Sequence, residues 1–318
     1  MPKKNEPIDL SKVKTYPLSE RISKVSSSDF ARAWKKGLSL KNFLDTLPDI
    51  LAGTDIRQVI AAVSEAAGNK NVVLFGMGAH VIKVGLNPVV IDLMSRGVIT
   101  GVAMNGAGII HDFEVAMHGR TSEDVSASIS DGSFGMARET CQFLAEAISE
   151  ADTDSEGLGE AVGRAITKKQ LPLADQSILA TGFRLGIPVT VHVAVGTDIV
   201  HMHPQFDAAK TGSLTHRDFR LFAAMVAKLD GGVYLNAGSA VILPEIFLKA
   251  VALVRNLGHN IQKLTTVNLD FIRHYRPLTN VIDRPTAGGA KGINLIGHHE
   301  IMIPLIAAGV IEMLGPPT

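Results

Sequence analysis

Short apolar runs that end in small or polar residues, each followed by a helical pattern, recur along this chain and limit the folds open to it. The run at residues 98–104 has the length and branching of a buried strand, and it ends in four small residues, Asn105 to Gly108. Further strands are expected at residues 72–75, 189–195, 232–236, 264–269 and 292–296. This alternation predicts an α/β fold with a doubly wound, mostly parallel six-stranded sheet and a ligand crevice at its carboxyl edge.

Composition narrows the class of partner. Lys plus Arg and Asp plus Glu number 31 each in 318 residues, so the formal charge is zero and neither nucleic acid nor an anionic membrane is favoured. Only 19% of residues are charged, which suits a large core or a surface covered in an oligomer. The single Cys141 excludes an intrachain disulfide, and the start of the chain lacks the apolar core of a signal peptide. We therefore expect a cytoplasmic protein.

Two parts of different composition are expected. Residues 1–27 are polar and rich in Ser and Lys, which is typical of an N-terminal arm outside the core. Residues 28–318 are expected to form a single α/β domain. Its first part has a helical pattern from residue 30 to 66, which Pro48 and Gly53 are expected to interrupt.

Four strand ends are candidates to line the crevice at the carboxyl edge. They are the segments at residues 76–80, 105–108, 236–239 and 297–300, and three of them combine small residues with a helix start whose free N–H groups would favour a phosphate. None is a G-x-G-x-x-G fingerprint, and the chain has no P-loop. Several such loops at separate strand ends nevertheless favour nucleotide or dinucleotide binding.

Two titratable residues, His111 and Asp112, directly follow the second of these loops. Taken alone, residues 105–108 are either a simple chain turn or a ligand site, because glycine-rich strand ends serve both purposes. Their place in a series of strand-end loops favours a role facing a cofactor.

Other polar residues allow two interpretations each. His201 and His203 could complete a metal site with His111, Asp112 or the group at residues 298–300, or they lie in a solvated loop before Pro204. Asp198 could accept a ribose hydroxyl or a substrate amine, or it caps a helix or turn. Lys291 could be a covalent or phosphate-binding lysine, or an ordinary surface residue. We predict no bound metal.

The order of these strand ends resembles the deoxyhypusine synthase family. That family carries a Gly-x-Thr-Ser-Asn turn, a Thr-Ala-Gly-Gly-x-Glu-Glu-Asp motif, an Ile-Pro-Val strand with an Asp-containing turn, and a Gly-Gly-Gly strand end. A last strand runs into an Asp-Ala-Ser/Thr turn and an apolar helix. This chain has similar segments in the same order, from about residue 28 to its end, at residues 76–80, 105–112, 187–198, 236–238 and 293–304.

The resemblance implies a Rossmann-like homotetramer that holds NAD at the carboxyl edge of the sheet, in active sites shared between subunits. Members of the family use NAD to oxidise spermidine and transfer its aminobutyl group, by way of an enzyme lysine, to a protein lysine. NADP is not excluded. The residues expected to contact the cofactor are Gly76, Gly78, Ala79, His80, Asn105, Gly106, Ala107, Gly108, Asp198, Asn236, Gly238, Ser239, Gly297, His298 and His299.

The chain departs from the family at the residues that carry its chemistry. The Trp-Gly-Lys motif with the covalent lysine is absent, and the corresponding region offers Arg284, which forms no imine. The family's Lys-His-His is replaced by residues 241–243, which are apolar. Arg273 and Arg276 stand where acids would bind a polyamine, so they would hold a carboxylate or phosphate instead.

We therefore expect an NAD-dependent transferase or oxidoreductase that acts on a small molecule and is not a true deoxyhypusine synthase. His111 or His203 would be the acid–base group, and Asp112 would orient it. Arg273, Arg276 and Lys291 would contact the substrate. Two alternatives stay open at this point. One is a metal-dependent hydrolase or lyase built on the histidine clusters, and the other is a non-catalytic nucleotide-binding protein.

Overall fold

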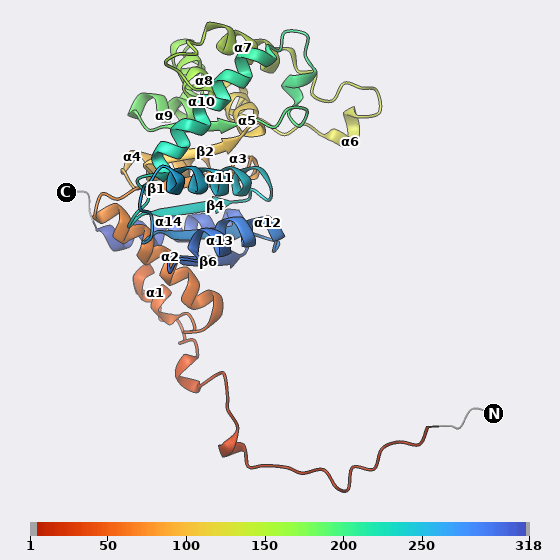
Figure 1. Ribbon diagram of the computed structural model, residues 1–318, viewed down its shortest axis with the longest axis vertical. Helices are drawn as coiled ribbons and strands as arrows, with labels where there is room; N and C mark the ends of the chain where they lie inside the picture. Colours follow the sequence, from red (N-terminus) through yellow and green to blue (C-terminus); the bar gives the residue numbers. More distant parts are fainter. Residues whose placement is uncertain (1–4, 316–318) are drawn as a thin grey trace.

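The computed structural model describes residues 5–315, and its centre is one sheet of six parallel strands (Figure 1). The strands are β1 (Val73–Met77), β2 (Gly101–Asn105), β3 (Val189–His192), β4 (Val233–Ala237), β5 (Thr265–Asp270) and β6 (Lys291–Ile296). Each lies at or within a few residues of its predicted position, and every neighbouring pair is parallel. The predicted doubly wound α/β sheet is therefore confirmed.

The strand order is β3-β2-β1-β4-β5-β6, so the direction of winding reverses between β1 and β4. In doubly wound sheets, ligands bind outside the carboxyl ends of the strands at such a reversal. The loops that follow β1 and β4 are consequently the first places to look for a cofactor site, and they begin at Gly78 and Gly238.

Helices cover both faces of the sheet and bury a separate apolar core on each. The first face carries α1 (Leu40–Thr46), α2 (Leu51–Gly68), α4 (Asn87–Ser95), α5 (Gly106–His118), α7 (Arg138–Glu150), α8 (Leu158–Lys168), α9 (Ile178–Leu185) and α14 (His299–Leu314). The second face carries α10 (Ala208–Val226), α11 (Ile242–Asn256), α12 (Tyr275–Pro277), the π-helical turn η5 (Leu278–Asp283) and α13 (Arg284–Thr286). In residues 5–315, no helix is long and apolar enough to cross a membrane.

Some predicted helices are shorter than their patterns indicated. Residues 30–39 are not helical, and Gly53 lies inside α2, so only the interruption at Pro48 is confirmed. The helix expected after β1 is split into α3 (His80–Lys83) and α4, because Gly85 takes a left-handed conformation with φ of 79°. The helix expected from residue 121 is reduced to α6 (Val125–Ser128), which Figure 1 shows projecting near the β3 end of the sheet.

Residues 5–39 run away from the sheet in a mostly extended conformation (Figure 1). Apolar side chains along them are exposed, among them Ile8, Tyr16 and Ile22, and they form no core of their own. Residues 1–4 of the predicted arm and residues 316–318 of the predicted domain lie outside the described residues.

Side chains of α10 close the outer edge of β3. Thr215 Oγ1 donates a hydrogen bond to the Val191 carbonyl at 2.7 Å and accepts one from the Val193 N–H at 3.1 Å. The Val191 N–H donates to Asp218 Oδ2 at 2.8 Å. An edge strand whose backbone groups are satisfied by side chains offers no template for another strand, so this end of the sheet is closed.

Two helical glycines should respond in opposite ways to a methyl group. In α8, a Cβ on Gly159 would lie 1.8 Å from the Val189 carbonyl oxygen, whereas a Cβ on the exposed Gly212 of α10 would meet nothing within 4 Å. Gly159→Ala should lower the free energy of unfolding by about 1–3 kcal/mol through overpacking. Gly212→Ala should raise it by about 0.5–1 kcal/mol. Urea denaturation of both variants is the test, and equal effects would contradict the close packing of α8 on β3.

Candidate functional site

A cavity of about 460 Å³ lies beyond the carboxyl ends of β2 and β3. Its walls come from α3, α5, residues 120–125, 134 and 137, and the turn after β3 that begins at Thr197. Its polar lining consists of Lys83, His111, Glu114, Arg120, Thr121, Ser122, Glu123, Thr197 and Asp198. This hollow is called the His111 cavity below. Six of these side chains are titratable, so the cavity brings several charged or ionisable groups within reach of a ligand.

His111 is held from one side by a chain of hydrogen bonds. Its Nδ1 lies 2.5 Å from Thr121 Oγ1, and that hydroxyl donates to Glu114 Oε2 at 2.5 Å. Thr140 of α7 donates to the other Glu114 oxygen at 3.1 Å. Burial, together with the nearby positive charge of Lys83, lowers the pKa of His111 to about 4. The imidazole is therefore neutral at pH 7 and can accept a proton.

Asp198 lines the same cavity and has the opposite shift. Burial raises the pKa of Asp198 to about 6, although a backbone hydrogen bond from Ala107 lowers it in part. His201 accepts a hydrogen bond at Nδ1 from the Gly196 N–H, so its Nε2 carries the proton, 4.0 Å from Asp198 Oδ2. The cavity thus combines a neutral histidine with a carboxyl group that takes up a proton near neutral pH.

Sequence reasoning missed the other polar residues of the cavity. Lys83 and Arg120 bring positive charge to its wall, and Thr121 and Glu114 fix the histidine. The spacing of His111 and Glu114, three residues apart on one helix, was the only available signal that they share a face.

The loop at residues 105–108 does not offer a free helix N-terminus. Asn105 caps α5 by accepting a hydrogen bond from the Gly108 N–H at 3.2 Å. Asp198 sits against the same helix end, where a Cβ on Gly106 would lie 2.0 Å from its Oδ2. These contacts favour the capping interpretation of Asp198. A phosphate at this helix end would have to displace a carboxylate of the chain itself.

Asp112 does not orient His111, contrary to our expectation. It is fully buried, and its Oδ2 accepts hydrogen bonds from Ser177 Oγ at 2.5 Å and the Leu179 N–H at 3.1 Å. Its Oδ1 accepts from the Ile178 N–H at 2.9 Å and Asn87 Nδ2 at 3.1 Å. Asp112 therefore holds the N-terminus of α9, and Thr121 with Glu114 takes the orienting position beside His111.

The other three predicted loops meet around the reversal of strand order. The Gly78 N–H donates to the Ala237 carbonyl at 2.9 Å, and a Cβ on Gly78 would lie 2.3 Å from the Gly238 oxygen. Gly238 has φ of 66°, and a Cβ there would lie 2.8 Å from the His299 ring. The rings of His80 and His299 are 5.5 Å apart. Only glycine at positions 78 and 238 lets these loops approach so closely.

A row of three asparagines crosses the sheet beside these loops. Asn236, Asn268 and Asn294 are in register on β4, β5 and β6, and each side-chain amide donates to the next at 2.8 Å. Two buried polar atoms here have no hydrogen-bond partner within residues 5–315, namely Asn236 Oδ1 and His299 Nδ1. Such orphaned atoms fit a place where a polar ligand binds.

Four predicted site residues lie away from the His111 cavity. His203 Nε2 is 2.9 Å from the Gly135 carbonyl, which pins its ring to the loop before α7. Arg276 lies 3.4 Å from Glu245, and Arg273 is on the exposed turn after β5. Lys291 is the exposed first residue of β6. None of the four lines the cavity.

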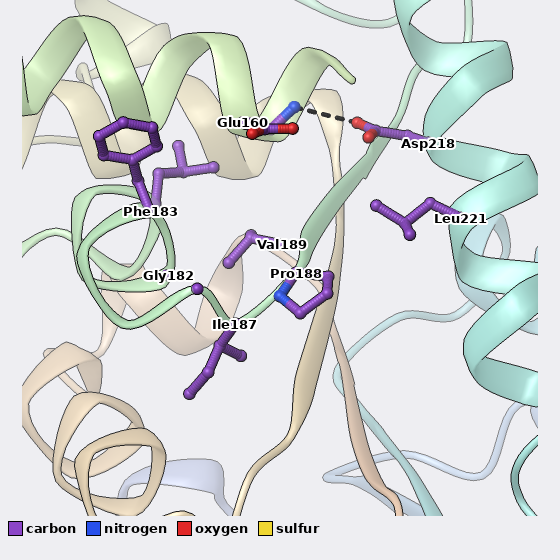
Figure 2. Close-up of a pocket in the computed structure, with 11 residues that line it drawn as sticks. Glu160, Gly182, Phe183, Ile187, Pro188, Val189, Asp218 and Leu221 are labelled. Carbon is purple, nitrogen blue, oxygen red and sulfur yellow. Dashed lines mark hydrogen bonds between the residues drawn. The ribbon is translucent and has the colours of Figure 1, made fainter. Parts of the chain in front are cut away.

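A second, smaller cavity of about 180 Å³ lies at the amino end of β3 (Figure 2). Figure 2 shows Asp218 of α10 bonded to the backbone of α8, where it accepts from the Gly159 N–H at 3.0 Å. Burial raises the pKa of Asp218 to about 7. Since this carboxylate also accepts from the Val191 N–H of β3, its bonds join three elements. We interpret it as structural.

Comparison with solved structures finds the same fold in several proteins of low sequence identity. The ternary complex of AgrE with ornithine and NAD⁺ matches 81% of this chain and 33% of its own, with a TM-score of 0.55 and 11% identity. A protein assigned as a deoxyhypusine synthase from Entamoeba histolytica matches 87% of this chain and 96% of its own, with the same score and identity. A protein assigned as LOR/SDH from Methanococcus maripaludis matches 95% of this chain and 75% of its own, with a TM-score of 0.53 and 13% identity.

The chain has the doubly wound fold of these proteins. Likeness at such low identity shows the fold alone. The chain spans about a third of the length of the AgrE chain and of ArgZ, a cyanobacterial arginine dihydrolase that it also matches. No protein-family model and no curated protein matches the sequence. The expected resemblance to deoxyhypusine synthase is thus supported as a likeness of fold.

Asp112→Asn should destabilise the protein strongly. The amide has one acceptor oxygen for four donors, so buried N–H and O–H groups lose their partner and the free energy of unfolding should fall by about 3 kcal/mol. Asp175→Asn, on the exposed turn just before α9, is the matched control and should change it by less than about 0.5 kcal/mol. Urea denaturation decides, and similar values for both variants would contradict the capping role.

The lowered pKa of His111 makes stability depend on pH with a defined sign. Below pH 6.5 the unfolded chain takes up a proton at this residue, whereas the folded protein does so only near pH 4. The stabilising contribution of the neutral imidazole is therefore present above pH 6.5 and is lost as the pH falls. Between pH 6 and 4.5, the unfolding free energy of the wild type should fall relative to His111→Gln by about 1.4 kcal/mol per pH unit. Parallel curves in urea denaturation would show that His111 titrates normally.

Proposed function

We propose that this protein is an NAD-dependent enzyme that binds a small molecule in the His111 cavity and uses His111 as its proton acceptor. The observation that carries this proposal is a neutral, hydrogen-bonded histidine in a cavity at the carboxyl edge of a doubly wound sheet. Ligand sites of such sheets occur at this edge. A general base must be unprotonated at working pH, and the environment of His111 keeps it so, although a pKa of about 4 makes this imidazole a weaker base than a free one.

NAD fits the loops around the reversal of strand order better than the loop before α5. At the reversal, Gly78 and Gly238 let the strand-end loops pack closely on each other, and Asn236 Oδ1 and His299 Nδ1 offer unpaired polar atoms. Ser239 follows in the same loop. These residues would hold the nucleotide. When bound, NAD supplies a hydride acceptor, and the AgrE complex is a precedent on the same fold.

The polar residues of the cavity would carry out proton transfer and substrate binding. His111 would take the proton that leaves a hydroxyl or amine of the substrate as the carbon beside it is oxidised. Asp198, whose pKa is about 6, would exchange a second proton near neutral pH. Lys83 and Arg120 would attract a carboxylate or phosphate of the substrate, the role expected earlier of Arg273 and Arg276.

No observation favours the metal-dependent alternative. Residues 5–315 contain no group of three or more His, Cys, Asp and Glu side chains arranged to hold a metal ion. His201 and His203 make separate hydrogen bonds to the backbone, to Gly196 and Gly135. The transferase activity, the homo-oligomer and the cytoplasmic location stay predictions. The exposed apolar side chains of residues 5–39 support the oligomer, because contact with another chain would cover them.

Nucleotide binding is testable without knowledge of the substrate. NAD and NADP are added separately to the purified protein, and the thermal midpoint of unfolding is measured. At a concentration one hundredfold above its dissociation constant, the bound nucleotide should stabilise the fold by about 2.7 kcal/mol. Gly238→Ala should abolish this gain, because its methyl group would press on the His299 ring.

Gly97→Ala is the matched control for backbone strain. Gly97 also has a positive φ, of 70°, but its Cβ would meet nothing within 4 Å and it lies before β2, at the opposite edge of the sheet. This variant should lose stability yet keep the full nucleotide shift. No shift with either nucleotide in the wild type would overturn the cofactor assignment.

A further inference from the structure

The segment between α5 and α7, residues 119–137, forms one wall of the His111 cavity. It leaves α5 at Gly119, whose φ of 67° ends the helix in a left-handed turn. Two residues later, Thr121 places its hydroxyl against His111. The segment therefore does more than enclose the cavity, since it supplies the side chain that touches the proposed base.

The direction of the hydrogen bonds fixes which imidazole nitrogen carries the proton. A carboxylate only accepts, so Thr121 must give its single hydroxyl proton to Glu114. The Thr121 oxygen can then only accept from His111, which places the imidazole proton on Nδ1. The other nitrogen, Nε2, is left with the lone pair.

Glu114 is itself held on both sides. Thr121 donates to its Oε2, and Thr140, from the first turns of α7, donates to its Oε1 at 3.1 Å. Its carboxylate is largely shielded, with 21% of the side chain exposed. Glu114 is thus a fixed acceptor, and the chain of bonds has a single direction from His111 to Thr121 to Glu114.

We propose that Thr121 and Glu114 are positioning residues that lock His111 in the Nδ1–H form and so present Nε2 as the proton acceptor of the cavity. The catalytic meaning of this inference rests on the proposed function, whereas the hydrogen-bond geometry is that of the protein without a ligand. A further consequence follows for the segment at residues 119–137. Because Thr121 belongs to this segment, the packing of the segment against α5 both forms a wall of the cavity and sets the tautomer of the base.

A purely structural role for Thr121 is the competing interpretation, in which its bonds merely anchor the segment. The two differ in what they require of the imidazole. Anchoring requires only that the segment stay in place, whereas positioning requires one defined tautomer. The tautomer is therefore the quantity to measure.

The experiment is long-range ¹H–¹⁵N correlation spectroscopy of ¹⁵N-histidine-labelled full-length protein at pH 7, without added ligand. The His111 signals are assigned by their loss in His111→Gln. The wild type and Thr121→Ser should show Nδ1 protonated and Nε2 unprotonated, because serine retains the hydroxyl. Thr121→Val should lose this preference. Glu114→Gln should shift His111 toward the Nε2–H form, because its amide can donate to Thr121 and reverse the chain of bonds.

Thermal unfolding of each variant is recorded in the same buffer, so a change of tautomer is read only from folded protein. Nε2 protonated in the wild type, or an unchanged Nδ1–H form in both folded Thr121→Val and folded Glu114→Gln, would overturn the inference. This failure is distinct from failure of the proposed function. Nucleotide binding is measured separately by the thermal shift and involves other residues.

Discussion

The packing of the helices depends on three buried carboxylates. Each of them joins a helix N-terminus to a distant part of the chain. Asp112 of α5 holds α9, Asp218 of α10 holds α8 and the edge of β3, and Asp198 lies against the start of α5. Burial raises the pKa of all three, to about 6, 7 and 6 for Asp112, Asp218 and Asp198. Backbone N–H groups and the positive end of the helix dipole face each carboxylate and offset the cost of burying it. The helices on the β3 side are thus fixed by directed bonds as well as by apolar contact.

This arrangement divides the strand ends into two classes. The end of β2 is filled by the chain itself, since Asn105 and Asp198 satisfy the first turn of α5. The ends of β1 and β4 instead pack closely on each other through Gly78 and Gly238, and unpaired polar atoms lie beside them. A loop rich in small residues therefore has two possible uses, and what decides between them is whether a distant side chain reaches the helix start.

The sequence was enough to predict the six strands, because each is an apolar run bounded by small residues, a pattern set by local chemistry. It also pointed to His111, which follows such a run and which the structure places in the wall of the cavity. The sequence did not show that His111 and Asp112 have different roles, because it does not reveal which way each side chain of a helix points. In the structure, His111 points to the cavity and Asp112 points to α9. The role of Thr121 could not be predicted from the sequence for another reason. Its role depends on how the segment after α5 folds back, which no local pattern specifies.

The position of α3 explains how the two halves of the proposed site could act together. Its first residue, His80, lies 5.5 Å from the His299 ring at the strand reversal, and its last residue, Lys83, lines the His111 cavity. Three residues of α-helix rise about 4.5 Å, so a single turn separates the two places. Burial and the nearby His299 lower the pKa of His80, which favours its neutral form, while Lys83 brings positive charge to the other end of the turn. A nucleotide at the reversal and an anion in the cavity would then lie on opposite sides of one helical turn.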